Sequence, residues 1–192
     1  MLLATRCAGC GRIGPTPCAP CVATMARAGP VTPVAGLDRV AAALAYDGAA
    51  REVVARVKYR NERAVVGWLA ALVAELLRPG EVDVVTWAPT TEARRRRRGF
   101  DQAELLARRV ARECGLPCRD LLRRGPGPPQ TGRDAAHRQV GPAFSPRRRL
   151  DGVAVAVIDD VVTTGATLGA AGRALGAAGA GRRIGLAAAH PP

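Results

Sequence analysis

The segment VAVAVIDDVVTTGATLGAAG, residues 153–172, changes character twice along its length. Apolar residues typical of a buried strand run up to two adjacent aspartates, Asp159 and Asp160. A turn rich in Thr and Gly follows, and a helix-like Ala/Leu pattern completes the segment. A strand that passes through a short turn into a helix is half of a strand–helix–strand unit. This segment therefore predicts a parallel sheet.

The same alternation of patterns extends along most of the chain. Runs of apolar residues predict strands at 40–46, 82–88, 153–158 and 183–189. Helical spacing predicts helices at 49–59, 64–77, 104–114 and 168–178, the third with Asp101 as its N-cap. Strands that alternate with helices indicate an α/β domain with a parallel sheet flanked by helices. Residues 123–146 are rich in Gly, Pro and Arg without periodicity, which predicts a long functional or mobile loop.

Charge and hydropathy narrow the class of protein. The chain has 29 basic and 16 acidic residues, a formal net charge of +13, and 48% hydrophobic residues. It can therefore bury a substantial core and is not a disordered polymer. The charge predicts attraction to polyanions, such as phosphate-bearing substrates or nucleic acid, that weakens as salt rises. We find no apolar run long enough for a signal peptide or membrane span and expect a cytoplasmic location.

Two CxxC pairs lie near the start of the chain. Cys7 and Cys10 form the first pair, and Cys18 and Cys21 form the second after an interval of seven residues. In a reducing compartment such cysteines are thiols or metal ligands rather than disulfides. Four thiolates complete a tetrahedral zinc with no open position, which predicts a structural site. Four incidental thiols or a redox pair are the alternatives.

The turn after Asp159 and Asp160 has the composition of an anion site. At the end of a parallel strand, free N–H groups and the positive end of a helix dipole attract an anion. Thr163, Thr164 and Thr167 add hydroxyl donors. The turn lacks the lysine of a nucleoside triphosphate P-loop. The two carboxylates can accept hydrogen bonds from vicinal hydroxyls, and the turn can bind a monophosphate. A ribose 5-phosphate group carries both of these partners. The alternative is that these residues only cap an ordinary strand–turn–helix unit.

These residues carry a family resemblance. IDDVVTTGATL, residues 158–168, resembles the phosphoribosyl pyrophosphate signature of type I phosphoribosyltransferases. The double CxxC, YDGAAREVVARVKYRNER from residue 46, RRRGFDQAELLAR from residue 96 and PPQTGRDAAHRQVGPAF from residue 128 precede it in that order. Together they are similar to the ComF family of phosphoribosyltransferase-like proteins, whose members are associated with DNA uptake in naturally transformable bacteria. The similarity covers nearly the whole chain.

The resemblance implies a domain organisation and a ligand. A zinc-binding element at 1–28 and a linker at 29–36 would precede a type I phosphoribosyltransferase-like domain at 37–192. Asp159 and Asp160 would hold the ribose hydroxyls of phosphoribosyl pyrophosphate and, through water, a Mg²⁺ ion bound by the pyrophosphate. The 5-phosphate would lie in a cradle formed by Thr163, Thr164, Gly165, Ala166 and Thr167.

A second set of residues would bind the pyrophosphate. The turn after the strand at 82–88 matches the position of the family's pyrophosphate loop, so Pro89 and Thr90 would face the leaving group. An ordinary turn is the alternative. Lys58, the sole lysine, could reach phosphates or be a solvated surface residue. Arg97 belongs to a run of five arginines, which predicts either a solvated basic face or a contact with pyrophosphate or a nucleic-acid backbone.

The long loop holds the last predicted site. Gln130, Thr131 and Gly132 resemble the family's mobile flap, which would exclude water from a hydrolysis-prone intermediate. A disordered linker is the alternative. Gln139 stands where the family usually has Asn, and Pro142 where it usually has Gly. These departures concern loop contacts more than the phosphate cradle.

Two functions of different classes follow from these patterns. The first is a Mg²⁺-dependent phosphoribosyltransferase whose acceptor the sequence does not identify. The second is a binding protein for single-stranded DNA or a competence protein, which uses the transferase fold as a sensor or vestigial scaffold. With only two each of Trp, Tyr and Phe, phosphate-backbone contact is favoured over base stacking. A zinc scaffold without ligand ranks last, and a homodimer would suit the fold by analogy.

Overall fold

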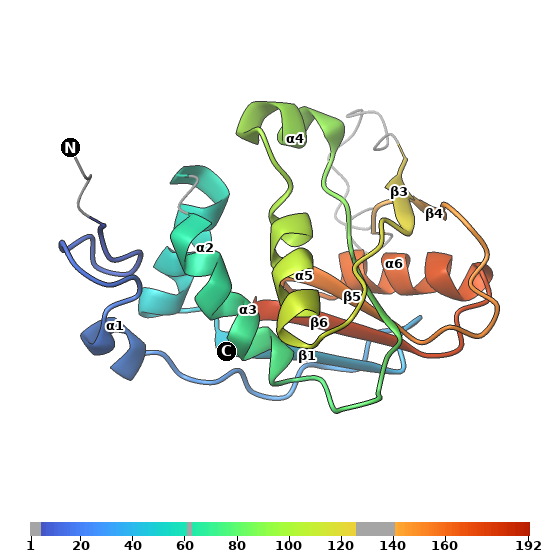
Figure 1. The fold of residues 1–192 in the computed structure, drawn as a ribbon, viewed down its shortest axis with the longest axis horizontal. Helices are drawn as coiled ribbons and strands as arrows, with labels where there is room; N and C mark the ends of the chain where they lie inside the picture. The colour runs from blue at the N-terminus through green and yellow to red at the C-terminus, as the bar shows by residue number, and fades with distance from the viewer. Residues whose placement is uncertain (1–4, 61–62, 126–140) are drawn as a thin grey trace.

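The computed structural model describes residues 5–60, 63–125 and 141–192, although the side chains of 58–60 and 63 lie outside this description (Figure 1). Helices and strands follow each other along the chain in an irregular alternation. In order they are α1 (Ala19–Ala23), β1 (Arg39–Ala45), α2 (Gly48–Arg60), the 3-10 turn η1 (Arg63–Val65), α3 (Val66–Ala74), β2 (Val84–Trp87), α4 (Glu92–Arg98), α5 (Gln102–Glu113), β3 (Leu122–Arg124), β4 (Phe144–Pro146), β5 (Val155–Val161), α6 (Ala166–Ala177) and β6 (Arg183–His190).

The main sheet has four strands in the order β1-β6-β5-β2, and all of its neighbours are parallel. Its centre is therefore β5 and β6, the two strands joined by α6. Ile158 of β5 pairs with Leu186 of β6 and with Trp87 of β2. All carboxyl ends meet at one edge of the sheet, where ligands of open parallel sheets bind.

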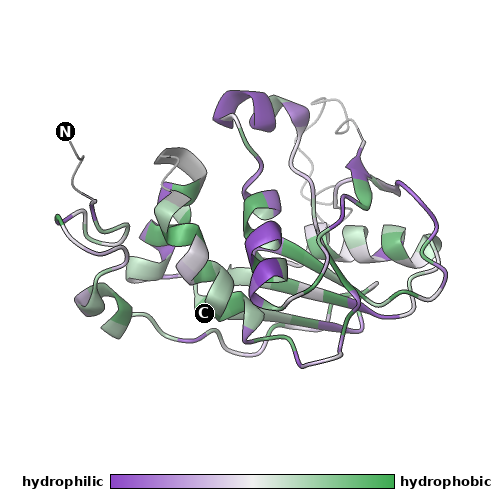
Figure 2. Ribbon diagram, viewed as in Figure 1, coloured by the Kyte–Doolittle hydropathy of each residue, from purple (hydrophilic) through white to green (hydrophobic). Residues whose placement is uncertain are grey.

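Both faces of this sheet are buried, as expected for parallel strands. Successive side chains of β5 point to opposite faces. Ala156 and Ile158 join the core formed with α2, α3 and α5, whereas Val155 and Val157 join the core formed with α6. In Figure 1, α3 and α5 lie on the near side of the sheet, and Figure 2 shows that the strands are largely hydrophobic while α4 is almost entirely hydrophilic. No helix in the described part of the chain has the length and apolar character needed to cross a membrane.

The amino-terminal cysteine segment packs against the α/β unit. Ala8 is fully buried in the same core as Ala50 and Val53 of α2. The chain then runs beside β1, where the N–H of Ala28 donates to the carbonyl of Ala43 at 3.2 Å. The cysteine segment is thus in contact with the sheet and helices from which the rest of the molecule is built.

The predicted fold class is confirmed: a parallel sheet is flanked by helices and preceded by a cysteine cluster. The four predicted strands and four predicted helices all occur, with ends shifted by a few residues. The structure differs from the prediction at several points, including the short helix α1 within the cysteine segment. The strand at 153–158 continues to Val161 because its last residues still pair with β6, and the arginine run forms the separate helix α4. The predicted loop at 123–146 contains β4 and all of β3 except its first residue, Leu122.

Candidate functional site

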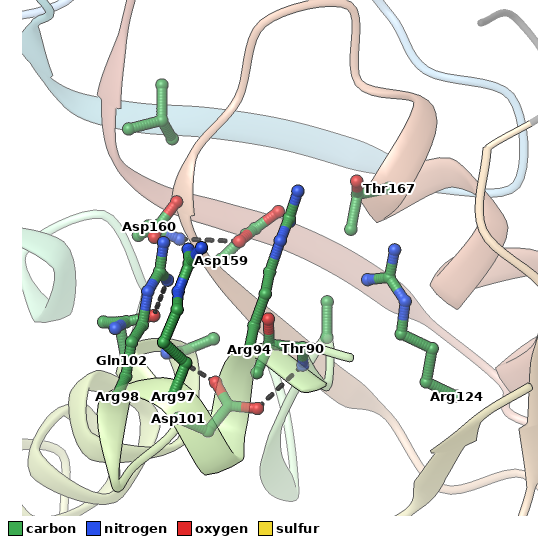
Figure 3. Close-up of a pocket in the computed structure, with 13 residues that line it drawn as sticks. Thr90, Arg94, Arg97, Arg98, Asp101, Gln102, Arg124, Asp159, Asp160 and Thr167 are labelled. Carbon is green, nitrogen blue, oxygen red and sulfur yellow. Dashed lines mark hydrogen bonds between the residues drawn. The ribbon is translucent and has the colours of Figure 1, made fainter. Parts of the chain in front are cut away.

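A cavity of about 300 Å³ lies at the carboxyl ends of β2 and β5. These strands are neighbours in the sheet, so the segments that follow them face one another. Figure 3 shows charged side chains converging on the cavity from several separate elements. The lining residues are Ala88, Thr90, Arg94, Arg97, Arg98, Asp101, Gln102, Ala103, Arg124, Asp159, Asp160, Val161 and Thr167.

Asp159 and Asp160 both border this cavity. They lie within β5 rather than beyond it, because Asp159 still pairs with Ala187 of β6. Oδ1 of Asp159 accepts the backbone N–H of Asp160 at 2.8 Å. Asp159 also borders a smaller cavity under the loop that follows β5, and Asp160 also borders an apolar pocket beside Gln102. The two carboxylates therefore approach the main cavity from opposite faces of the sheet edge.

The predicted phosphate loop lines that smaller cavity of about 40 Å³ with all five of its residues, 163–167. Thr167 alone of the five also borders the main cavity. Gly165, with φ of +74°, is the N-cap of α6, so the loop ends at the positive end of a 12-residue helix. Among the described residues, none accepts a hydrogen bond from the N–H of Thr163, Thr164 or Gly165. The loop therefore has unused donors for an anion.

The turn after β2 is different, because the N–H groups of Ala88 and Thr90 are already bonded within the protein. The N–H of Ala88 donates to the carbonyl of Ile158 at 3.0 Å, and the N–H of Thr90 donates to Oδ2 of Asp101 at 2.7 Å. Pro89 has no N–H to offer. These N–H groups are therefore not offered to an anion, and side chains supply donors at this point of the cavity.

Helix α4 supplies three such side chains. Thr91 is its N-cap, so the arginine run is helical, and Arg94, Arg97 and Arg98 lie on one face that lines the cavity. Nη1 of Arg98 donates to Oε1 of the buried Gln102 at 2.7 Å. The solvated basic face predicted for the arginine run is therefore correct only for the arginines that do not line the cavity. The Thr91–Glu92 capping pattern before the run was the available signal for a helix.

Arg124 of β3 reaches the cavity from the side opposite α4 (Figure 3). Its Nη1 donates to the carbonyl of Pro89 at 3.1 Å, and its guanidinium lies 5.6 Å from the ring centre of Phe144. Its Nε is buried and has no hydrogen-bond partner among the described residues. Burial and then the positive charge of Arg94 lower the pKa of Arg124. The sequence offered no sign of this role, since Arg124 is far from the other site residues along the chain.

The buried carboxylate of Asp101 links two of the segments that line the cavity. Its side chain is 5% exposed, and its Oδ1 accepts the N–H of Ala103 at 3.0 Å while Oδ2 accepts that of Thr90. It therefore joins the start of α5 to the turn after β2. Burial raises the pKa of Asp101, an effect that the N–H donors only partly offset. The position of Asp101 before the helix predicted its role as a cap, whereas no local pattern indicated the bond to Thr90.

Replacing Asp101 with Ala should lower the free energy of unfolding by about 2–4 kcal/mol, because a helix cap is lost and buried N–H donors become unpaired. Urea denaturation measures this change. Thr91→Ala is the matched control, since it removes the cap of the exposed helix α4, where Oγ1 accepts the N–H of Arg94 at 3.3 Å. The control should cost about 1 kcal/mol or less. Equal losses in the two variants would contradict the linking role of Asp101.

The four cysteines of the two CxxC pairs form a separate candidate metal site. Their sulfur atoms all lie within 4.8 Å of one another. Sγ of Cys7 is 3.7 Å from Sγ of Cys21, and Sγ of Cys10 is 3.8 Å from Sγ of Cys18. A tetrahedral zinc with bonds of about 2.3 Å requires sulfur–sulfur separations of about 3.8 Å. The cluster could therefore hold a zinc ion.

The thiols of this cluster are not equivalent. Burial disfavours the Cys7 thiolate, but N–H donors from Cys10, Cys18 and Gly9 outweigh it and lower the pKa of Cys7 to about 6. Burial raises the pKa of Cys21 to about 12. Cys7 is therefore ready to bind a cation at neutral pH, whereas Cys21 ionises only when a metal supplies compensating charge.

Some predicted site residues lie outside the described residues. Gln130, Thr131 and Gly132 fall in the segment 126–140, which the structure does not describe. Lys58 belongs to α2, but its side chain is not described either. Apart from the four cysteines, the other predicted site residues line one of the two adjacent cavities, except Pro89, whose carbonyl accepts the bond from Arg124.

Comparisons with known proteins include a distant structural likeness. No family model matches the chain, and no curated protein matches it. A purine phosphoribosyltransferase from Pyrococcus horikoshii Ot3 is similar in structure, with 19% sequence identity and a TM-score of 0.42 over 63% of this chain and 70% of that one. Membership of the ComF family remains a hypothesis based on sequence motifs.

Proposed function

We propose that the main cavity binds phosphoribosyl pyrophosphate with Mg²⁺ and that the protein transfers the phosphoribosyl group to an acceptor. One observation carries this proposal. The Asp159–Asp160 pair, a phosphate loop with unused N–H donors, and arginines from two separate elements meet around adjoining cavities. A ribose with a 5-phosphate and a 1-diphosphate presents hydroxyls between two anionic groups, and each of these has a complementary partner here.

In this proposal the loop of residues 163–167 binds the 5-phosphate. Its unused N–H groups and threonine hydroxyls are donors, and the α6 dipole favours negative charge at this position. Asp159 borders both cavities, so a ribose whose phosphate lies in the loop would extend its hydroxyls toward this carboxylate.

The carboxylates also fit the proposed metal ion. Mg²⁺ prefers oxygen ligands and usually keeps several of its waters, so one or two carboxylates suffice to hold it. Asp159 and Asp160 bring two carboxylates to the border of the cavity, whereas the carboxylate of Asp101 accepts N–H groups of the turn after β2 and of α5. A bound Mg²⁺ would stabilise the negative charge of the departing diphosphate.

Side chains would bind the diphosphate itself. Arg97 belongs to this proposed subsite, as do Thr90 through its hydroxyl, Pro89 as part of the turn, and Lys58. Arg94 and Arg124 join it, because they flank the cavity and the N–H groups of Ala88 and Thr90 are already bonded. Guanidinium groups bind phosphate oxygens through paired N–H donors.

The proposed chemistry is a displacement at the anomeric carbon. The bond from this carbon to the diphosphate oxygen breaks, and its electron pair leaves with the diphosphate. A lone pair of the acceptor forms the new bond, and the acceptor releases a proton if it carries one. Arginines that face the departing group would stabilise the charge that develops on it.

The four-cysteine cluster has a structural role in the proposal. A zinc ion held by four thiolates has no open position for a substrate. The predicted cytoplasmic location is compatible with this assignment, because a reducing compartment keeps the cysteines available as thiolates.

Isothermal titration with phosphoribosyl pyrophosphate and Mg²⁺ tests the proposed function. We expect the wild type to bind, and the Arg94→Ala, Arg124→Ala pair should raise Kd by roughly 10- to 100-fold through loss of charged hydrogen bonds. Arg95→Ala with Arg96→Ala is the control, because these two exposed residues of α4 do not line the cavity. Equal weakening in both pairs would show only a general charge effect and contradict the diphosphate subsite.

Exposed arginines favour a second candidate function. Arg95 and Arg96 face solvent on α4, within a chain of net charge +13, and could contact a nucleic-acid backbone or an acidic competence partner. Trp87 and Phe100 are buried, which again disfavours base stacking. If this function holds, the wild type binds single-stranded DNA in low salt, and its affinity falls steeply as salt rises. The Arg95→Ala, Arg96→Ala variant should lose this binding, whereas the cavity variants should keep it.

A further inference from the structure

The segment between the cysteine cluster and β1 lies directly against α6. Nη1 of Arg173 in α6 donates to the carbonyl of Ala35 at 3.4 Å. A Cβ atom added to Gly172 would collide with the carbonyl oxygen of Gly36. The backbone at Ala35 and Gly36 therefore lies in close contact with α6.

Val34, in the same segment, packs against the first turn of α6. A Cβ atom on Gly165 would overlap Cγ2 of Val34, and one on Gly169 would lie 2.8 Å from Cγ1. The two methyl groups thus fill a notch that exists only because both positions are glycine. Gly165 is also the residue at which the phosphate loop becomes α6. Val34 therefore rests on the end of the phosphate loop.

The same loop end is confined on another side by the chain before β4. A Cβ atom on Gly141 would lie 2.5 Å from the carbonyl oxygen of Ala166. The segment that carries Val34 is itself anchored, because the N–H of Ala28 is bonded to β1 and the N–H of Asp38 is bonded to the carbonyl of Arg183 at 2.9 Å. Val34 is therefore held in place relative to the sheet from both directions.

We propose that Val34 is a positioning residue for the phosphate loop, so that the segment joining the cysteine cluster to the sheet is a working part of the anion site. The ligand class, a phosphate monoester, rests on the proposed function above. The loop that carries the N–H groups of Thr163, Thr164 and Gly165 lines one small cavity, so these groups bind one anion together only while the loop keeps its shape. None of them is bonded to another described residue, and the loop therefore depends on outside packing to keep that shape.

This role is separable from stabilisation of the core. Val34 is partly exposed and belongs to neither of the two buried clusters. Val31, in the same segment, is partly buried and packs against the cluster on the α6 side. The nearest atoms to a Cβ on Gly165 or Gly169 belong to Val34, Ala35 and Arg173, and none of them belongs to Val31. Val31→Ala is therefore a matched control that removes the same atoms from the same segment.

Hydrogen exchange on the ligand-free protein tests the proposal independently of any substrate. Val34→Ala should accelerate exchange of the amides in the first hydrogen-bonded turn of α6 by about 10-fold or more, because the end of the loop opens locally more often. The first of these amides is that of Gly169, whose N–H donates to the carbonyl of Gly165 at 2.8 Å. Val31→Ala should leave these amides unchanged. Val34→Thr, which keeps the branched shape, should restore slow exchange. Unchanged exchange in Val34→Ala would overturn the proposal.

Titration with ribose 5-phosphate and, separately, inorganic diphosphate adds a functional measurement. Val34→Ala should weaken ribose 5-phosphate binding about 5- to 20-fold and leave diphosphate binding unchanged, since only the first uses the loop. Faster exchange with unaltered ribose 5-phosphate affinity would overturn the link to binding. If the wild type binds neither probe, the proposed function fails, whereas the exchange measurement still decides the role of Val34.

Discussion

Removal of the metal from the four-cysteine cluster should lower the melting temperature by roughly 10 °C, because a structural zinc contributes directly to folding free energy. Cys7 and Ala8 are fully buried, and Ala8 shares a core with Ala50 and Val53 of α2. Without the ion, the buried thiol of Cys21 reverts to its protonated form, and the short segment has little other packing of its own. Loss of the packing between the cysteine segment and α2 should then destabilise α2 as well.

Zinc content by elemental analysis and melting by calorimetry, with and without a strong chelator, measure this effect. Cys7→Ser should reproduce it without chelator. Cys114→Ser with Cys118→Ser is the control, because neither residue belongs to the metal cluster in the described part of the chain. The control should keep its zinc and its response to chelator. A purified wild type that holds no metal and melts at the same temperature with chelator would contradict the zinc assignment.

Replacing Asp159 and Asp160 together with Asn should raise the Kd for phosphoribosyl pyrophosphate with Mg²⁺ by about 100-fold or more, since each charged hydrogen bond to a ligand contributes about 1.5–3 kcal/mol. The variant keeps the size of both side chains but loses the charge that would hold the metal. Both residues border the cavity and are half-buried, so the loss is only weakly compensated by solvent. The titration described above provides the measurement.

The matched control changes the same net charge elsewhere. Asp47→Asn with Asp151→Asn alters two exposed residues that do not line the cavity, and binding should stay within about 2-fold of wild type because exposed distant charges are screened by salt. Melting curves of both variants show whether they are folded. Full ligand affinity in a folded Asp159, Asp160 variant would rule out the proposed ribose and metal site.

The main elements of the fold were predictable because their signals are local and strong. Strands such as Val155–Val161 are buried on both faces, so they read as continuous apolar runs, and α5 shows an apolar stripe after a capping Asp101. The length of β5 was not predictable. Asp159 and Asp160 interrupt the apolar run, yet their backbone continues to pair with β6, and such pairing is invisible in a single sequence.

The helical structure of the arginine run was not predicted from the sequence either. Five like charges in succession are typical of a solvated face, and their mutual repulsion disfavours a free helix. The cap at Thr91 and the position between β2 and α5 make the run helical. Only then do Arg94, Arg97 and Arg98 share a face, which turns part of a basic run into the wall of a cavity.

The sequence alone specified the parts whose chemistry is contiguous: the aspartate pair with its phosphate loop, the four cysteines, and the alternation that builds a parallel sheet. Tertiary structure decided which distant groups meet them. Asp101 bonds to Thr90 across eleven positions of chain, Arg124 bonds to Pro89 across 35, and Val34 meets Gly165 from another part of the molecule. Long-range contacts depend on how strands are ordered and how helices pack, and no local pattern of residues encodes that order.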